Sequence, residues 1–229
     1  MIKEIVLKRN KLIATLDKKQ IIKSIMASLP GLKMAFMYFG GSVCYGTFIS
    51  GKSDYDINVV VDDLKGAFKT NISGTDVFIY GVSSILDRLN PNSPISQYKR
   101  SFIDDVLGLP DTLIGLNEEY KDIYEEYKNF DFNKNLKGFL TNFYEYFAFC
   151  FNGEFQVGKK FYHVIRMRGQ IENYKKTGVF SLDLSKSYFD EEIDYKLNWN
   201  NENRRKELNE KLEKYLDEIY EFKEELKDG

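Results

Sequence analysis

Two aspartates separated by one residue stand directly before an apolar run. Asp54 and Asp56 lie in SDYDINVVV, and the run follows the second aspartate. Alternate residues of a strand point to the same side, where two carboxylates repel each other unless a cation lies between them. Hard divalent ions such as Mg²⁺ prefer carboxylate and phosphate oxygens. The pattern therefore predicts a cation site at the start of a buried strand.

A glycine-rich turn precedes the two aspartates. Gly41 and Ser42 lie in FGGSVCYG, with eleven residues between Ser42 and Asp54. Glycine lets the backbone approach a phosphate closely, and the amides at the start of a following helix supply donors. The Ser42 hydroxyl adds another polar contact. We therefore expect the phosphates of a nucleoside triphosphate to lie between this turn and metal ions held by the aspartates.

A third carboxylate is expected on a neighbouring strand. Asp76 stands in GTDVFIY, among apolar and small residues at the start of a predicted strand. Two metal ions close together need at least one bridging carboxylate and a further ligand or base. We therefore assign Asp76 to the metal site and expect it to accept the proton of an attacking hydroxyl.

The elements that position these residues follow from the hydrophobic pattern of the first 90 residues. Short apolar, β-branched runs predict three strands, and Asp17 is the expected N-cap of a helix that Pro30 and Gly31 end. The expected strands cover 33–39, 55–61 and 75–82, and the expected helices cover 18–29, 42–45 and 84–89.

The rest of the chain is typical of a helical domain. A linker at 90–96 contains Pro and Asn, and the segments beyond it repeat apolar residues at helical spacing. Helices are expected over 136–151, 158–178 and 203–229. The sequence thus predicts a mixed α/β (α+β) fold, with a small mixed sheet in a first domain (1–90) and a helical domain (97–229).

These motifs resemble a known family. Gly41-Ser42 followed by Asp54-Tyr55-Asp56-Ile57 is similar to the signature of the polymerase-β-like nucleotidyltransferase superfamily, especially its small stand-alone bacterial and phage-borne members. Gly46 and Ser53 match further preferences of those members, although the loop between them is slightly longer here. The resemblance implies a nucleotidyltransferase core in which Asp54, Asp56 and Asp76 hold two Mg²⁺ ions, with Mn²⁺ as a substitute. It also implies that Gly41, Ser42 and Ser53 contact the nucleotide.

A polar stripe in the helical domain gives a second indication. Lys159, His163, Arg166 and Gln170 are spaced so that they share one face of a predicted helix. Such a stripe is also what a solvated surface produces. The resemblance implies that Lys159 and Arg166 contact nucleotide phosphates and that His163 contacts substrate or packs nearby.

Composition sets limits on the partners. The formal net charge is −2, so any contact with nucleic acid must come from a local patch. The N-terminal residues lack the apolar run of a signal peptide, and no stretch has the roughly 20 apolar residues of a membrane span. Cys44 and Cys150 are far apart, which does not favour a disulfide. We expect a cytoplasmic protein without a membrane partner.

The expected reaction transfers a nucleoside monophosphate from a nucleoside triphosphate to a hydroxyl group. The acceptor stays open between an RNA end, a protein side chain and a small molecule, with a slight preference for the two macromolecules. The main alternative is a non-catalytic nucleotide-binding or regulatory module on the same fold, and a helical interaction protein is a third. The sequence gives no indication of the base or of the role of the last forty residues.

Overall fold

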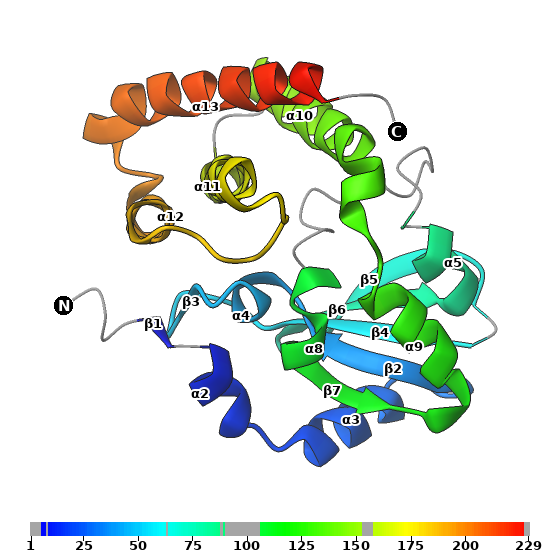
Figure 1. Ribbon diagram of the computed structural model, residues 1–229. Coiled ribbons are helices and arrows are strands. Elements are labelled where there is room, and N and C mark those ends of the chain that lie inside the picture. Colours follow the sequence, from blue (N-terminus) through cyan, green and yellow to red (C-terminus); the bar gives the residue numbers. More distant parts are fainter. Residues whose placement is uncertain are drawn as a thin grey trace. The chain divides into compact units, whose positions relative to one another are not determined.

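The computed structural model describes residues 6–7, 9–62, 64–87, 89, 106–152 and 158–226. These residues fall into two compact units. Residues 6–89 and 106–130 form the first, called here the sheet unit, and residues 131–226 form the second, called the helical unit. The predicted fold class is confirmed: a mixed sheet with helices is followed by a helical C-terminal part (Figure 1).

A five-stranded sheet in the order β5-β6-β4-β2-β7 is the centre of the sheet unit. Strand β4 runs parallel to β6, and the other neighbouring pairs are antiparallel. The strands are β2 (Met34–Phe39), β4 (Asp56–Val61), β5 (Ala67–Ile72), β6 (Thr75–Gly81) and β7 (Leu113–Leu116). A separate two-stranded sheet pairs β1 (Val6–Leu7) with β3 (Phe48–Ile49).

Both faces of the sheet are covered, which explains why the central strands are apolar on both sides. One face packs on helices α2 (Arg9–Ala14), α3 (Lys18–Ala27) and α4 (Gly41–Cys44) in a continuous core. On the other face, Phe36 meets Tyr124 of helix α9 (Lys121–Lys128) edge-on at 5.6 Å between ring centroids. Helices α5 (Val82–Asp87) and α8 (Leu109–Thr112) and the 3₁₀ turn η1 (Glu118–Tyr120) complete the unit.

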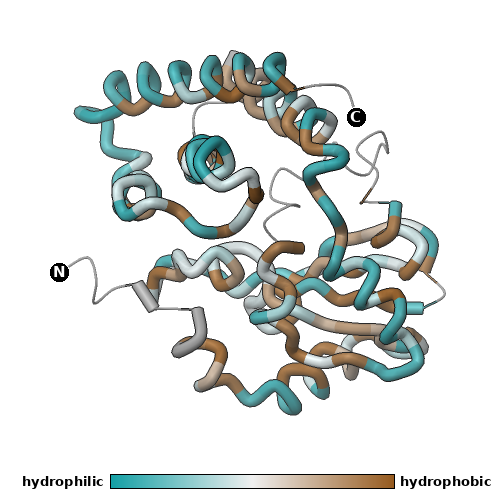
Figure 2. Tube along the Cα trace, in the orientation of Figure 1, coloured by the Kyte–Doolittle hydropathy of each residue, from teal (hydrophilic) through white to brown (hydrophobic). Residues whose placement is uncertain are grey.

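The helical unit is built from four long helices. Helix α13 alternates between polar and apolar residues in Figure 2, and its apolar stripe is buried. The helices are α10 (Leu136–Asn152), α11 (Tyr162–Thr177), α12 (Lys186–Asn198) and α13 (Arg205–Glu225), with 3₁₀ turns η2 (Phe132–Asn135), η3 (Lys159–Phe161) and η4 (Glu202–Arg204). Helix α11 ends at Gly178, whose φ of +71° is the left-handed conformation typical of a glycine C-cap.

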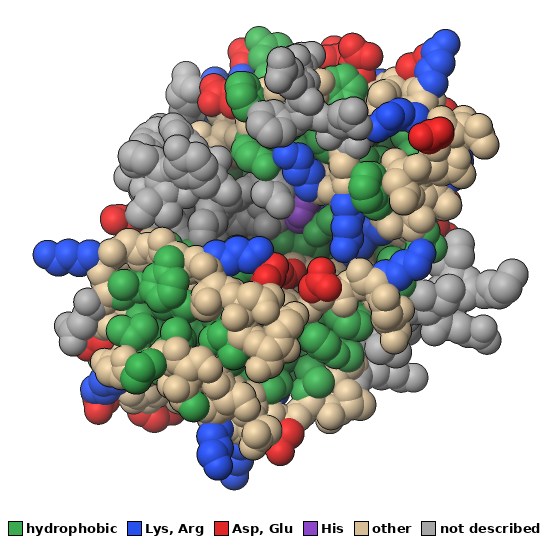
Figure 3. Space-filling model, turned by 180° about the vertical axis from the view of Figure 1, so that it is seen from behind, with side chains coloured by type: hydrophobic (Ala, Val, Ile, Leu, Met, Phe, Trp, Pro, Cys, Tyr) green, Lys and Arg blue, Asp and Glu red, His purple; other side chains and the backbone are tan. Residues whose placement is uncertain are grey.

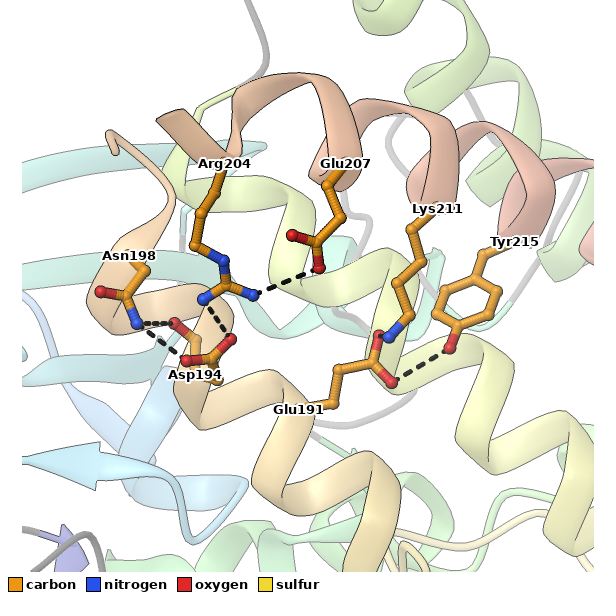
Figure 4. Close-up of polar contacts among 7 residues, drawn as sticks. All are labelled: Glu191, Asp194, Asn198, Arg204, Glu207, Lys211 and Tyr215. Carbon is orange, nitrogen blue, oxygen red and sulfur yellow. Dashed lines mark hydrogen bonds and ion pairs between the residues drawn. The ribbon is translucent and has the colours of Figure 1, made fainter. Parts of the chain in front are cut away.

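Ion pairs join α12 to α13 and to the turn before it (Figure 4). Arg204 contacts Asp194 at 2.7 Å, and Lys211 contacts Glu191 at 2.9 Å. The Tyr215 hydroxyl donates to the other Glu191 oxygen at 3.0 Å. Most of these groups are partly exposed, so each pair adds little alone and the network mainly fixes how the two helices align.

Several predicted elements are confirmed within a residue or two at their ends. These are β2, β4, β6, α3 with Asp17 as its N-cap, and α10. Helices α11 and α13 also exist where helices were expected, but α11 begins only at Tyr162, after the turn η3, and α13 ends at Glu225 instead of at residue 229. The short helix α4 begins at Gly41 with Gly40 as its N-cap, instead of beginning at Ser42 as expected. The predicted linker at 90–96 lies outside the described residues. The helix expected over 84–89 is α5, which begins and ends two residues earlier. The elements that were not predicted are the strands β1, β3, β5 and β7 and the helices α2, α8, α9 and α12.

Strand β7 changes the expected division of the chain. It pairs with β2, so the segment from residue 106 to residue 130 belongs to the sheet unit. The sequence analysis had placed this segment in the helical domain. The reason is topological, because the sheet receives its last strand only after the chain has passed through the expected linker.

None of the described helices is both long enough and apolar enough to span a membrane. Cys44 and Cys150 are buried free cysteines that lie in different units.

Candidate active site

Asp56 and Asp76 occupy matching positions on adjacent parallel strands. Asp56 is the register partner of Asp76, and the backbone N–H of Asp76 donates to the carbonyl of Tyr55 at 3.1 Å. Register partners in neighbouring strands place their side chains on the same face of a sheet. The structure therefore brings together two of the three predicted carboxylates at the end of the sheet where β4 and β6 begin.

The glycine turn lies directly against Asp56. The N–H of Gly40 donates to the Asp56 carbonyl at 2.9 Å, and Gly41 has a φ of +55°. A Cβ atom built on Gly41 would lie 1.9 Å from Oδ2 of Asp56. Glycine is required here for two reasons, the left-handed backbone and the close approach of the carboxylate. The predicted proximity of the turn to the carboxylates is thus a feature of the structure.

Asp76 has two partners on the neighbouring strand β5. Lys69 Nζ lies 2.6 Å from Oδ2, and Asn71 Nδ2 donates to Oδ1 at 3.1 Å. The hydrogen bond from Lys69 is the main cause that holds the pKa of Asp76 below its ordinary value, and Asn71 acts in the same direction against the opposing effect of burial. Asp76 is therefore held as a carboxylate, the form that a metal ligand requires.

Asp54 and the two serines have different surroundings. Asp54 is exposed and precedes β4. Ser53 fixes the loop before it, since its hydroxyl accepts a hydrogen bond from the Ile49 N–H at 3.0 Å. Ser42 is only 6% exposed, and its carbonyl accepts a bond from the Thr47 N–H at 3.0 Å. The contacts seen for both serines stabilise the loops around the site.

Carboxylate oxygens are suitable ligands for Mg²⁺ or Mn²⁺, so the chemistry of Asp56 and Asp76 fits the predicted ions. Among the residues that the structure describes, no three or more His, Cys, Asp or Glu side chains are arranged as a metal-binding group. The pair formed by Asp56 and Asp76 is thus the part of the predicted set that the backbone brings together. A two-metal site that includes Asp54 stays a prediction.

The polar stripe of the helical unit is largely buried. His163, Arg166 and Gln170 are 5%, 1% and 0% exposed, while Lys159 is exposed in η3. The interpretation of these three residues as a solvated surface is therefore wrong. Arg166 donates to Glu192 of α12 at 2.7 Å, and the His163 ring lies 4.1 Å from that of Tyr162. A contact of Lys159, His163 or Arg166 with a nucleotide stays a prediction.

Lys69 and Asn71 were missed by the sequence analysis. Both belong to β5, whose residues AFKTNI are mostly exposed and lack the apolar content of a buried strand. The available signal was the turn at 71–74 directly before β6, which is typical of a hairpin. Extending that hairpin backwards would have placed Asn71 beside Asp76.

The surface charges do not select an acceptor. On the face drawn in Figure 3, Lys and Arg side chains lie among Asp and Glu side chains. This mixture agrees with the net charge of −2 and gives no particular support to an RNA acceptor.

No protein-family model matches this chain, and no curated protein matches it.

Proposed function

We propose that this protein is a metal-dependent nucleotidyltransferase, which moves a nucleoside monophosphate from a nucleoside triphosphate to a hydroxyl acceptor. The observation that carries the proposal is the pairing of Asp56 with Asp76 on adjacent parallel strands, with the backbone of Gly41 against the Asp56 carboxylate. A carboxylate pair beside a glycine turn is suited to hold divalent cations close to phosphate oxygens.

Alternative structural roles account poorly for this arrangement. Two carboxylates on one sheet face repel each other, and Lys69 on β5 places an ammonium beside Asp76. A turn that served only to join β2 to the following loop would not need a glycine pressed against a carboxylate. Binding of a cation and a triphosphate there would explain both the carboxylate pair and the glycine beside it.

The proposed chemistry is an in-line displacement. The acceptor hydroxyl oxygen attacks the α-phosphorus, a new P–O bond forms, and the bond to the β-phosphate oxygen breaks to release pyrophosphate. In this proposal Asp76 takes the hydroxyl proton, and Asp54 and Asp56 are the further candidate ligands. Bound Mg²⁺ would supply charge neutralisation for the reacting phosphates. The protein contributes mainly by positioning.

Asp56→Asn tests the assignment, because it removes the charge and preserves the shape of the side chain. We expect it to abolish Mg²⁺-dependent transfer of label from α-labelled nucleoside triphosphates in a cell extract. Loss of an outer metal-site partner costs about 10–100-fold, so loss of a direct ligand should cost at least about 100-fold. Asp87→Asn is a matched control, since Asp87 is an exposed residue at the end of α5. Full activity of Asp56→Asn would refute the proposed site.

The second candidate is a non-catalytic nucleotide-binding module, which the same carboxylate pair would also support. The two differ in pyrophosphate release. Triphosphate binding that depends on Mg²⁺, without pyrophosphate release in any extract fraction, would favour the binding module. The molecule that carries the label, whether RNA, protein or a small compound, would identify the acceptor class.

A further inference from the structure

The contacts of Asp76 come from one side. Lys69 and Asn71 both lie on β5, and Asn71 is the register partner of Asp76 across the antiparallel pair. Asp56 lies on the opposite side, on β4. Asp76 thus lies between β5, from which Lys69 contacts one carboxylate oxygen and Asn71 the other, and Asp56 on β4.

These contacts leave Asp76 able to bind a cation. An ionised carboxylate has about four acceptor positions on its two oxygens, of which the structure shows Lys69 and Asn71 using one each. The remaining positions can serve a metal ion. The ammonium of Lys69 is held in place by a further contact, because Nζ lies 5.1 Å from the centre of the Phe78 ring.

We propose that Lys69 and Asn71 are positioning residues for the transfer reaction, holding the Asp76 carboxylate from the β5 side while Lys69 limits how strongly Asp76 binds a divalent ion. This inference rests on the proposed function. Asn71 fixes the direction of the carboxylate, as outer partners of metal ligands commonly do. Lys69 also orients it, and its positive charge repels a divalent cation bound to the same group.

The two roles predict different effects. Lys69→Met keeps a flexible apolar side chain that can pack on the Phe78 ring and removes the charge, so Mn²⁺ should bind about three to ten times more tightly. Label transfer at saturating Mn²⁺ should nevertheless fall about tenfold, because Asp76 is less well oriented. Asn71→Ala should lower transfer by about tenfold without increasing Mn²⁺ affinity. A residue with only a structural role would not separate affinity from turnover in this way.

The experiment titrates Mn²⁺ into the full chain by calorimetry, alone and with each nucleoside triphosphate. Lys69→Arg keeps the charge and should restore the affinity of the unmodified protein. Lys65→Met makes the same chemical change at an exposed lysine outside β5 and should alter nothing. Because the Lys69 side chain is 52% exposed, the Lys69 variants are expected to fold.

The outcomes separate the two proposals. If the unmodified protein binds Mn²⁺ and folded Lys69→Met binds it equally or more weakly, the inference about Lys69 is wrong and the proposed function stands. If the unmodified protein binds no Mn²⁺ under any of these conditions, the proposed function is overturned and the inference falls with it. Tighter binding by Lys69→Met together with rescue by Lys69→Arg supports the inference.

Discussion

Gly41→Ala offers the sharpest link between the backbone and the proposed chemistry. An alanine at the Gly41 φ of +55° costs about 1 kcal/mol through left-handed strain alone. The new Cβ would also lie 1.9 Å from Asp56 Oδ2, whereas ordinary contact begins at 3.4 Å, so the carboxylate must retreat by about 1.5 Å. A misplacement of about 1 Å at a reacting centre can reduce the rate on the order of 10²-fold.

Gly51→Ala is the matched control for this change. Gly51 has a φ of +74°, and a Cβ built there meets nothing within 4 Å. The left-handed strain should therefore cost each variant about 1 kcal/mol, or roughly 4 °C in melting temperature, and Gly41→Ala should lose more because its Cβ also displaces the Asp56 carboxylate. Transfer of α-label should fall about a hundredfold in Gly41→Ala and stay near normal in Gly51→Ala. Equal transfer activity in the two variants would refute the argument that Gly41 makes room for the Asp56 carboxylate.

Two further predictions concern the helical unit. Glu192→Ala should lower the free energy of chemical unfolding by about 3 kcal/mol, because it removes the carboxylate that pairs with the buried charge of Arg166. An Arg166→Met/Glu192→Leu double variant should recover most of that loss. An unfolding free energy of Glu192→Ala equal to that of the unmodified protein would contradict the importance of the pair. Burial raises the pKa of Tyr188 to about 12, so the stability from this group is present below pH 10 and lost as the pH rises from 10 to 12. One pKa unit corresponds to about 1.4 kcal/mol, so Tyr188→Phe should flatten the fall in unfolding free energy across that pH range. An identical pH profile in the variant would show that Tyr188 does not contribute to this fall.

The hydrophobic pattern of the sequence was sufficient for the central elements. Strands β2 and β4 are apolar on consecutive residues because both faces of the sheet are covered, and such runs are visible without any tertiary information. Strand β5 could not be found in this way. It lies at the edge of the sheet and exposes most of its residues, so its pairing with β6, and not its composition, makes it a strand.

The residues of the candidate site also differ in how far the sequence predicts them. Asp56 and Asp76 could be predicted to meet, since each begins an apolar strand and parallel strands present matching ends at one edge. The contacts of Lys69 and Asn71 with Asp76 depend on the antiparallel register of β5 and β6. A shift of this register by one residue would place the Lys69 and Asn71 side chains on the opposite face of the sheet. Sequence reasoning can therefore identify carboxylates at the start of neighbouring strands more readily than the groups that contact them.

Arg166 shows the limit of reasoning from a helix face. The spacing of His163, Arg166 and Gln170 correctly predicts one shared face, and all three are buried. The spacing cannot tell whether that face meets solvent, a ligand or another helix. Glu192, which forms an ion pair with Arg166, lies on a helix that the sequence pattern did not reveal. A buried guanidinium requires a counter-charge. The ion pair with Glu192 therefore gives Arg166 a structural role within the helical unit, whether or not a nucleotide binds.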